Sequence, residues 1–148
     1  MNKLPEIRML TVRQPWPCPI FTAGKAENRT WFTRYFGLVA IHSGARSAER
    51  QTTRQREMAE AAYNAAPESL RLYSAVLGVA RLADCHICRP GCCSNPWVER
   101  GPKSWHWVFE DAQSFEEPIT GVKGALGLRV PAADVLAQIR QRMGVSVR

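Results

Sequence analysis

The sequence predicts an α+β domain: a small β-barrel of about six strands with two or more helices packed outside it. Three observations predict this fold. Short apolar stretches with the character of strands follow one another along most of the chain. Glycines interrupt or bound several of them, which suits the bends of a curved sheet. One long helical excursion between strands and a second helix at the end supply the outer cover. We expect residues 1–148 to form a single domain.

The N-terminal third is expected to supply three strands. The first covers 7–13 and is stopped by Pro15, because proline cannot donate to a sheet. An irregular or short helical turn then runs to Gly24. Residues 27–32 and 37–43 read as the second and third strands.

The central part is expected to form a helix, a strand and a loop. Residues 47–64 make the first helix, with Ser47 as its N-cap. Residues 75–84 form a continuous apolar run typical of a buried strand. A loop rich in proline and glycine covers 85–104.

The C-terminal part is expected to complete the fold with two strands and a helix. Residues 104–111 alternate, so that Trp105, Trp107 and Phe109 share one face. The glycine-containing stretch 121–130 is predicted to be the last strand. In 131–143, the helix begins with a proline, repeats apolar residues every four positions (Val135, Ile139, Met143) and stops at a glycine.

Length and composition fit a globular protein. The chain has 148 residues, 45% of them hydrophobic and 22% charged, which is enough to form a core without staples. No apolar run approaches the roughly 20 residues that span a bilayer. The N-terminal sequence lacks the apolar centre of a secretory signal. We therefore expect a cytoplasmic protein with no membrane association, and the oligomeric state stays open.

Positive charge is concentrated in the first part of the chain. Residues 1–56 contain ten Lys or Arg and three Asp or Glu, whereas residues 57–148 contain ten of each kind, so the first part carries the whole excess of +7. Such asymmetry indicates a polyanionic partner, nucleic acid before membrane. The alternative is a modestly basic protein with no specific polyanionic partner.

A charged group of residues lies at the start of the second predicted strand. Glu27 and Arg29 are two positions apart and point to one face, and Lys25 can approach the same spot. Arginine and lysine hold phosphates, and a glutamate beside two cations stays ionised, so that it can act as a base or accept a hydrogen bond. Trp31 shares this face and offers a stacking surface for a base. The alternative is a structural Glu–Arg salt bridge beside a core tryptophan.

Polar residues at the ends of the first and third strands are candidates for the same cleft. We expect Arg13 and Gln14 to line its mouth, and Trp16 to plug the end of the barrel. His42 and Ser43 end the third strand and could supply a proton or a hydroxyl, although a lone histidine is more often structural.

An arginine repeat follows these residues. Arg46, Arg50 and Arg54 recur every four residues, so they are predicted to form one stripe on the first helix. The stripe could follow a phosphate backbone. A solvated helix face is the commoner explanation, and we favour it slightly.

Five cysteines are present, and four of them fall within nine residues: Cys85, Cys88, Cys92 and Cys93. Without a secretory signal, disulfides are not expected. Structural zinc prefers four thiolate or imidazole ligands, for which His86 or His106 could substitute, but adjacent cysteines make a poor second pair. We favour reduced cysteines that pack the loop near Trp97, with no metal and no other cofactor. A zinc site of the four cysteines is the alternative.

Five blocks occur in order over roughly residues 8–130: LTVRQPW, GKAENRTW, RYFGLVAIHSG, SNPWVERGPKSWHWVFED and GVKGALGL. Together they resemble the ASCH (activating signal cointegrator homology) domains of the PUA-like superfamily, and their joint order is more specific than any single block. The resemblance implies a PUA-like β-barrel with a cleft lined by a Lys-Glu-Arg motif.

The resemblance also implies a connection to RNA or nucleotides. Some members look like RNA-binding modules, one relative is an amidohydrolase of acetylated cytidine, and another is a ribonuclease; the fold does not choose between them. The motif matches at Gly24, Lys25, Glu27 and Arg29. The family usually reads Gly-x-Lys-x-x-Glu-x-Arg, so two spacers are missing here. In the amidohydrolase the Glu27 position is a threonine nucleophile, so glutamate argues against an unchanged mechanism.

We therefore predict RNA or modified-nucleotide binding, with DNA as a further candidate partner. The expected binding residues are Arg13, Gln14, Lys25, Glu27, Arg29, Trp31, His42, Ser43 and Arg46. The alternative is a hydrolase on the same scaffold, a ribonuclease or a nucleobase amidohydrolase, with Lys25 and Glu27 as catalytic residues. A third hypothesis is an accessory protein that binds another protein through the arginine stripe.

Overall fold

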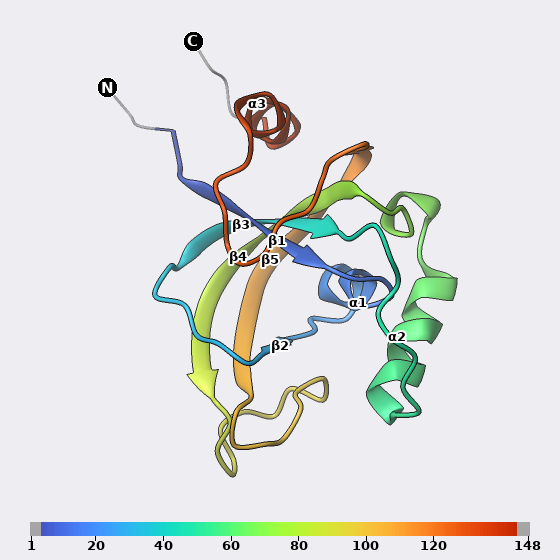
Figure 1. Ribbon diagram of the computed structural model, residues 1–148, viewed down its shortest axis with the longest axis vertical. Helices are drawn as coiled ribbons and strands as arrows, with labels where there is room; N and C mark the ends of the chain where they lie inside the picture. Colours follow the sequence, from blue (N-terminus) through green and yellow to red (C-terminus); the bar gives the residue numbers. More distant parts are fainter. Residues whose placement is uncertain (1–3, 145–148) are drawn as a thin grey trace.

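The computed structural model describes residues 4–144 and contains a curled five-stranded sheet with three α-helices (Figure 1). The order of strands across the sheet is β1-β3-β4-β5-β2, so β1 and β2 form its two edges. The α+β class predicted from the sequence is confirmed. The strands are β1 (Ile7–Val12), β2 (Glu27–Arg29), β3 (Gly37–Ser43), β4 (Ala75–Ile87) and β5 (Trp105–Ile119).

The two long central strands give the sheet its curl. β4 and β5 pair antiparallel with three shifts of register along the ladder, and such bulges bend and twist a strand. Gly78 lets the layers approach closely, because a Cβ there would collide with the Gln113 carbonyl oxygen and the Phe21 ring. β1 joins β3 in parallel, while β2 adds only three residues, antiparallel to β5.

The helices are α1 (Pro17–Thr22), α2 (Arg54–Ala65) and α3 (Ala133–Arg142), with a short 3-10 helix η1 (Glu68–Leu70) after α2. α1 and α3 pack against the sheet, and α2 packs mainly on α1. In α3 the predicted four-residue repeat is confirmed, since Val135, Ile139 and Met143 all pack on the sheet. Figure 1 shows α3 at the opposite end of the molecule from the loop between β4 and β5. Within residues 4–144, no helix has the length and apolar character needed to cross a membrane.

Helix α2 starts later than the predicted range of 47–64. Thr53 is its N-cap and accepts a hydrogen bond from the Arg56 backbone N–H at 3.1 Å. Ser47, the predicted cap, instead pairs with the Tyr73 hydroxyl at 2.7 Å. The prediction of Ser47 as N-cap is therefore wrong, because the chain reaches the helix only after a further irregular stretch.

A cluster rich in tryptophan forms one part of the core. Trp107 of β5 is fully buried among Leu10 of β1 and Ile41 of β3. Trp105 and Phe109 pack in the same cluster, which confirms the predicted alternation of 104–111. Trp31 meets Trp107 edge-to-face, with 4.6 Å between ring centroids.

The predicted last strand, 121–130, is not a strand. This segment makes a single bridge to the sheet, in which Met9 and Arg129 exchange backbone hydrogen bonds. Gly121 and Gly127 have φ values of +68° and +73°, which break the extended backbone that a strand needs. Within residues 4–144 the sheet therefore has five strands, not six, and the edge strands β1 and β2 are not paired to close a barrel.

Candidate nucleic-acid interface

The two edges of the curled sheet are linked by a side chain. Arg29 of β2 donates from Nη2 to the Thr11 carbonyl oxygen of β1 at 2.9 Å. That carbonyl belongs to an edge strand, whose outer groups lack a neighbouring strand. We call this place, where Arg29 of β2 meets Thr11 of β1, the seam. The arginine there gives a hydrogen-bond donor to a carbonyl oxygen that a neighbouring strand would have bonded in a closed barrel.

A buried chain of charges places Arg29 at the seam. Gly24, with a φ of +63°, turns the backbone from α1 into β2. Lys25 Nζ then lies 2.6 Å from Glu27 Oε1, and the other carboxylate oxygen accepts from Arg29 Nη2 at 2.8 Å and Nε at 3.1 Å. Lys25 is only 1% exposed and Glu27 7%. These two ion pairs bring together Lys25, Glu27 and Arg29, the three charged residues that the sequence analysis grouped.

Glu27 is ionised in this setting. Burial alone would raise the pKa of its carboxyl, but the nearby charges of Lys25 and Arg29 and their hydrogen bonds outweigh burial, so its pKa is lowered. Lys25 is satisfied on the inner side, since Nζ also donates to the Ala26 carbonyl at 2.9 Å. The carboxylate therefore fixes the orientation of the Arg29 guanidinium.

A basic cleft of about 710 Å³ lies over the seam. Four of its lining side chains are cationic, namely Arg13, Arg29, Arg46 and Lys123, and Trp31 adds an aromatic wall. Within residues 4–144 the cleft lining contains no carboxylate, thiol or imidazole. The remaining lining residues are Thr11, Gly44, Ala45, Gly124, Ala125, Leu126 and Gly127.

Four of the predicted binding residues line this cleft: Arg13, Arg29, Trp31 and Arg46. Lys25 and Glu27 lie behind it, buried beneath Arg29. Lys123 and its loop were not predicted as part of the site. The glycines of that loop were the available sequence indication, since a chain that runs close over a strand end needs small residues.

Gln14 does not line the cleft mouth, which corrects the expectation from the sequence. Its side chain is 1% exposed, and Nε2 donates to the carbonyl oxygens of Leu70 and Leu72 at 2.9 and 3.0 Å. Its amide holds η1 and the following turn against the end of β1. Trp16 packs half-buried on the tryptophan-rich core, with Lys25 Nζ 5.4 Å from its ring centroid.

His42 and Ser43 also lie outside the cleft lining, fully buried. Ser43 exchanges hydrogen bonds with the backbone of Ala75 at 3.2 and 3.3 Å. His42 Nε2 lies 2.6 Å from the Val122 carbonyl and Nδ1 3.0 Å from Thr11 Oγ1. The carbonyl can only accept, so Nε2 carries the proton and Nδ1 accepts from the hydroxyl.

This arrangement makes His42 a support for the cleft loop. Thr11 Oγ1 in turn accepts from the Ala125 backbone N–H at 3.3 Å. Burial lowers the pKa of His42, although the bond to Val122 opposes the shift. The neutral imidazole therefore holds both ends of residues 122–125 over the end of β1.

The predicted arginine stripe is wrong. Because α2 begins at Arg54, Arg46 and Arg50 lie in the irregular stretch before it. Arg46 faces the cleft instead, whereas Arg50 and Arg54 are exposed and do not line it. The four-residue spacing was therefore not a helical face.

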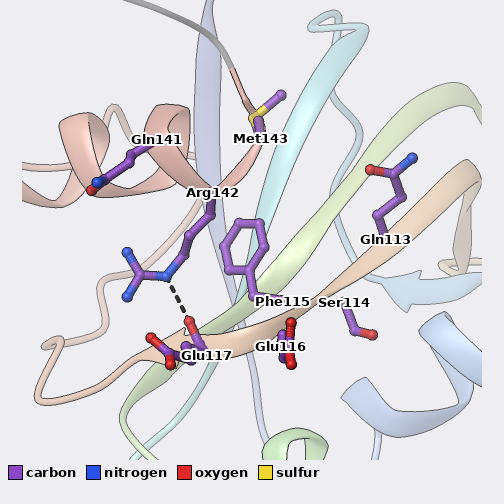
Figure 2. Close-up of a pocket in the computed structure, with 8 residues that line it drawn as sticks. All are labelled: Gln113, Ser114, Phe115, Glu116, Glu117, Gln141, Arg142 and Met143. Carbon is purple, nitrogen blue, oxygen red and sulfur yellow. Dashed lines mark hydrogen bonds between the residues drawn. The ribbon is translucent and has the colours of Figure 1, made fainter.

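A second pocket, of about 390 Å³, lies between β5 and α3 (Figure 2). Arg142 reaches across it and donates from Nε to the Glu117 carbonyl oxygen at 2.6 Å. Glu116 and Glu117 offset its single arginine, so this pocket lacks the positive excess of the cleft. It contains none of the residues predicted as the site.

The cysteine-rich loop gathers a different ligand set from the one considered in the sequence. Cys92 and Cys93 converge with His86 and His106, and the four ligand atoms all lie within 4.8 Å of one another. Cys85 packs instead on the tryptophan-rich core, because it is adjacent to His86 and points to the opposite face of β4. The sequence indicated that adjacent cysteines make a poor second pair of ligands, yet the two sulfurs lie 3.9 Å apart on the same side of the loop as the histidines.

Comparison with known proteins adds the fold class. No protein-family model matches the chain, and no curated protein matches it by sequence. The crystal structure of ASCH from Zymomonas mobilis is similar with a TM-score of 0.53 and 13% sequence identity, and the match covers 94% of each chain. The chain therefore has an ASCH-like fold, as the sequence blocks indicated.

Proposed function

We propose that the basic cleft binds RNA or a nucleotide, with the phosphates held by its cations and a base stacked on Trp31. The observation that carries this proposal is the lining itself, which has four cationic side chains and, within residues 4–144, no carboxylate. Such a concentration of one charge raises the local concentration of an anionic ligand. The likeness to an ASCH structure supports the same choice at the level of fold.

The cleft dimensions and lining suit a nucleotide. Its volume of about 710 Å³ lies in the usual range for small-molecule sites. Arginines at Arg13, Arg29 and Arg46 offer forked donors for phosphate oxygens. Trp31 presents an aromatic surface at the cleft, and bases stack on such surfaces with little regard to sequence.

Arg29 is oriented for this role before any ligand arrives. Its Nε and Nη2 are engaged by Glu27 and the Thr11 carbonyl, while Nη1 makes no hydrogen bond within residues 4–144. A guanidinium held at one edge loses little freedom when its free edge binds a ligand. In this view Lys25 and Glu27 are positioning residues.

The hydrolase alternative receives less support from the same residues. Lys25 Nζ is buried and already bonded to Glu27 and the Ala26 carbonyl. In the described part of the chain, the cleft lining offers no imidazole, carboxylate or thiol, the side chains that most often act as general acid or base. We therefore place binding ahead of turnover.

The experiment is fluorescence anisotropy with a labelled single-stranded RNA pool, with product analysis of the same samples. Arg13→Ala/Arg46→Ala removes two cleft cations, and Arg50→Ala/Arg54→Ala removes two exposed arginines outside it. We expect the first pair to weaken binding and to reduce the slope of log K against log salt by about 1.4, since each single-strand phosphate contact contributes about 0.7. The second pair should leave both nearly unchanged.

Two further measurements define the site and its ligand. Trp31→Ala should weaken binding by about 1–3 kcal/mol, the range for loss of one base stack, and a DNA pool of the same sequence tests whether the 2′-hydroxyl is read. Equal losses from both arginine pairs would contradict a site in the cleft. RNA product that depends on Lys25 would replace the binding proposal with the hydrolase alternative.

A further inference from the structure

Four side chains of types that can ligate a metal ion, from three parts of the chain, meet at the loop between β4 and β5. His86 lies on β4 and His106 directly opposite it on β5, as register partners in the ladder. Cys92 and Cys93 come from the loop that joins these strands. Among residues 4–144, these four side chains form the one group in which three or more His, Cys, Asp or Glu side chains could hold a metal ion.

Four of the distances among these atoms are close to those of a tetrahedral zinc site, and all pairs lie within 4.8 Å. A zinc ion with Zn–S of about 2.3 Å and Zn–N of about 2.05 Å places two sulfurs about 3.8 Å apart, sulfur and nitrogen about 3.5 Å, and two nitrogens about 3.3 Å. Here Cys92 Sγ and Cys93 Sγ are 3.9 Å apart, and His106 Nδ1 lies 3.5 and 3.9 Å from them. His106 Nδ1 and His86 Nε2 are 3.3 Å apart.

Outer hydrogen bonds aim both imidazoles at this point. His86 Nδ1 lies 2.7 Å from Asp84 Oδ2, and His106 Nε2 lies 2.8 Å from the Glu99 carbonyl oxygen. Each acceptor holds the proton on the outer ring nitrogen, so that the inner nitrogen presents its lone pair. A carboxylate or a carbonyl behind a ligating histidine is the usual outer shell of a metal site.

The loop backbone is shaped so that both thiols face inward. Cys92 N–H donates to the Arg89 carbonyl at 3.0 Å, with Pro90 and Gly91 between them. Gly91 has a φ of +72°, so the sequence places proline and glycine where a type II turn requires them. Arg100 adds a cation beside the sulfurs, with Nη1 3.5 Å from Cys92 Sγ.

The loop held by these residues also supports the candidate cleft. Beyond the cysteines, the Trp97 carbonyl accepts from Asn28 Nδ2 at 2.9 Å, and the Glu99 N–H donates to Asn28 Oδ1 at 2.8 Å. Asn28 lies between Glu27 and Arg29 on β2, and alternation turns it to the opposite face. The loop thus braces a strand of only three residues.

We propose that His86, Cys92, Cys93 and His106 form a structural zinc site that fastens the loop of residues 88–104 to β4 and β5. All four positions are filled by protein ligands, which is the pattern of a structural rather than a catalytic zinc. Through Asn28, the same site would hold β2 and its charged residues in register. This proposal does not depend on what the cleft binds.

The test is the zinc content of the full chain, purified with a reductant and without chelator, and titrated with Zn²⁺ if metal is lost on purification. We expect one tightly held zinc per chain. Cys92→Ser and Cys93→Ser should each abolish stoichiometric binding, and Cys88→Ser, a matched change in the same loop outside the set, should retain it. Failure to bind zinc stoichiometrically at micromolar concentration overturns the proposal, as does loss in Cys88→Ser equal to that in Cys92→Ser.

Cobalt substitution supplies a readout that does not depend on stability. Co²⁺ in place of zinc should show thiolate-to-metal charge transfer and the intense visible bands of a tetrahedral site, and both should vanish in Cys92→Ser. Asp84→Asn, which weakens the outer support of His86, should lower metal affinity roughly 10–100-fold. A cobalt spectrum without thiolate charge transfer would exclude the cysteines as ligands.

Discussion

Opposite faces of β2 carry two polar clusters that are assembled in different ways. On one face, Lys25, Glu27 and Arg29 come from five consecutive residues and meet because a strand repeats every two positions. On the other, Asn28 meets a loop whose cysteines join histidines from two strands. The first cluster ends in an open basic cleft. In the second, the two histidines and two cysteines bring their ligand atoms within 4.8 Å of one another.

The contrast shows how spacing in sequence relates to function in this fold. A cluster made by local alternation keeps its outermost cation partly exposed, at 24% of the Arg29 side chain, since the edge strand β2 has no further strand beside it within residues 4–144. A cluster made across a ladder, as by His86 and His106, surrounds its centre from several sides. We infer that the first is suited to a large anionic ligand and the second to a small cation.

The sharpest test of the comparison is Glu27→Gln. It leaves Lys25 buried without a counter-ion, and removing one partner of a buried ion pair costs about 3–5 kcal/mol of unfolding free energy. Urea denaturation measures this loss. Glu110→Gln is the matched control, because its ion pair with Arg81 is half exposed (53% and 47% of the side chains), and it should lose less than about 1 kcal/mol. Equal losses would mean that Lys25 is not effectively buried.

A second prediction concerns the loop over the cleft. A Cβ at Gly124 would lie 3.0 Å from Thr11 Oγ1 and 3.1 Å from His42 Cε1, so Gly124→Ala should push the loop outward. We expect a loss of about 1–3 kcal/mol, typical of overpacking, together with weaker RNA binding. Gly101→Ala meets nothing within 4 Å and should change stability by less than about 0.5 kcal/mol. Unaltered RNA binding by Gly124→Ala would remove the loop from the interface.

A third prediction tests whether the two faces of β2 are coupled. Asn28→Ala removes two hydrogen bonds to the loop, which should lower stability by about 1–3 kcal/mol. Hydrogen exchange should then rise in both the loop and β2. Asn64→Ala, at an exposed position of α2, is the control and should leave exchange in β2 unchanged. Faster exchange confined to the loop would show that the two faces act independently.

The smallest expected effect is a pH dependence from His42. Burial lowers its pKa in the folded chain, so the unfolded chain binds the extra proton first and stability falls as pH drops below about 6.5. His42→Gln should lose that part of the decline between pH 7.5 and 5.5. Urea unfolding of both proteins at the two pH values gives the change in unfolding free energy with pH for each, and the difference between the two changes is the contribution of His42. An identical decline in both would assign the pH dependence to other groups.

The sequence predicted most elements of this fold because their patterns are local. Residues 37–43 were recognised as a strand and the helix near 131–143 from its four-residue repeat, and both lie where predicted. Residues 121–130 were misread, because an apolar, glycine-containing stretch resembles a strand until its backbone angles are known. The prediction of Ser47 as N-cap was wrong for a similar reason, since Ser47 and Thr53 both carry a hydroxyl that can cap a helix.

The candidate site divides in the same way. The Lys25–Glu27–Arg29 group was predictable from alternation, and Arg13, Trp31 and Arg46 do line the cleft. Burial of Lys25 and the position of Lys123 were not predictable, because both depend on how segments of the chain pack in three dimensions. Gln14 looked equally available in sequence, yet its amide is bonded to backbone carbonyls 56 and 58 residues away.

The amino-acid sequence by itself determined the α+β class, the strand that aligns Glu27 with Arg29 and the excess of positive charge, since these follow from neighbouring residues. Only the tertiary structure decided that the sheet stays open, that Arg29 links its edges, and that Cys92 and Cys93 meet two histidines. Those outcomes depend on contacts between distant segments, whose geometry is set by how β4 and β5 bend.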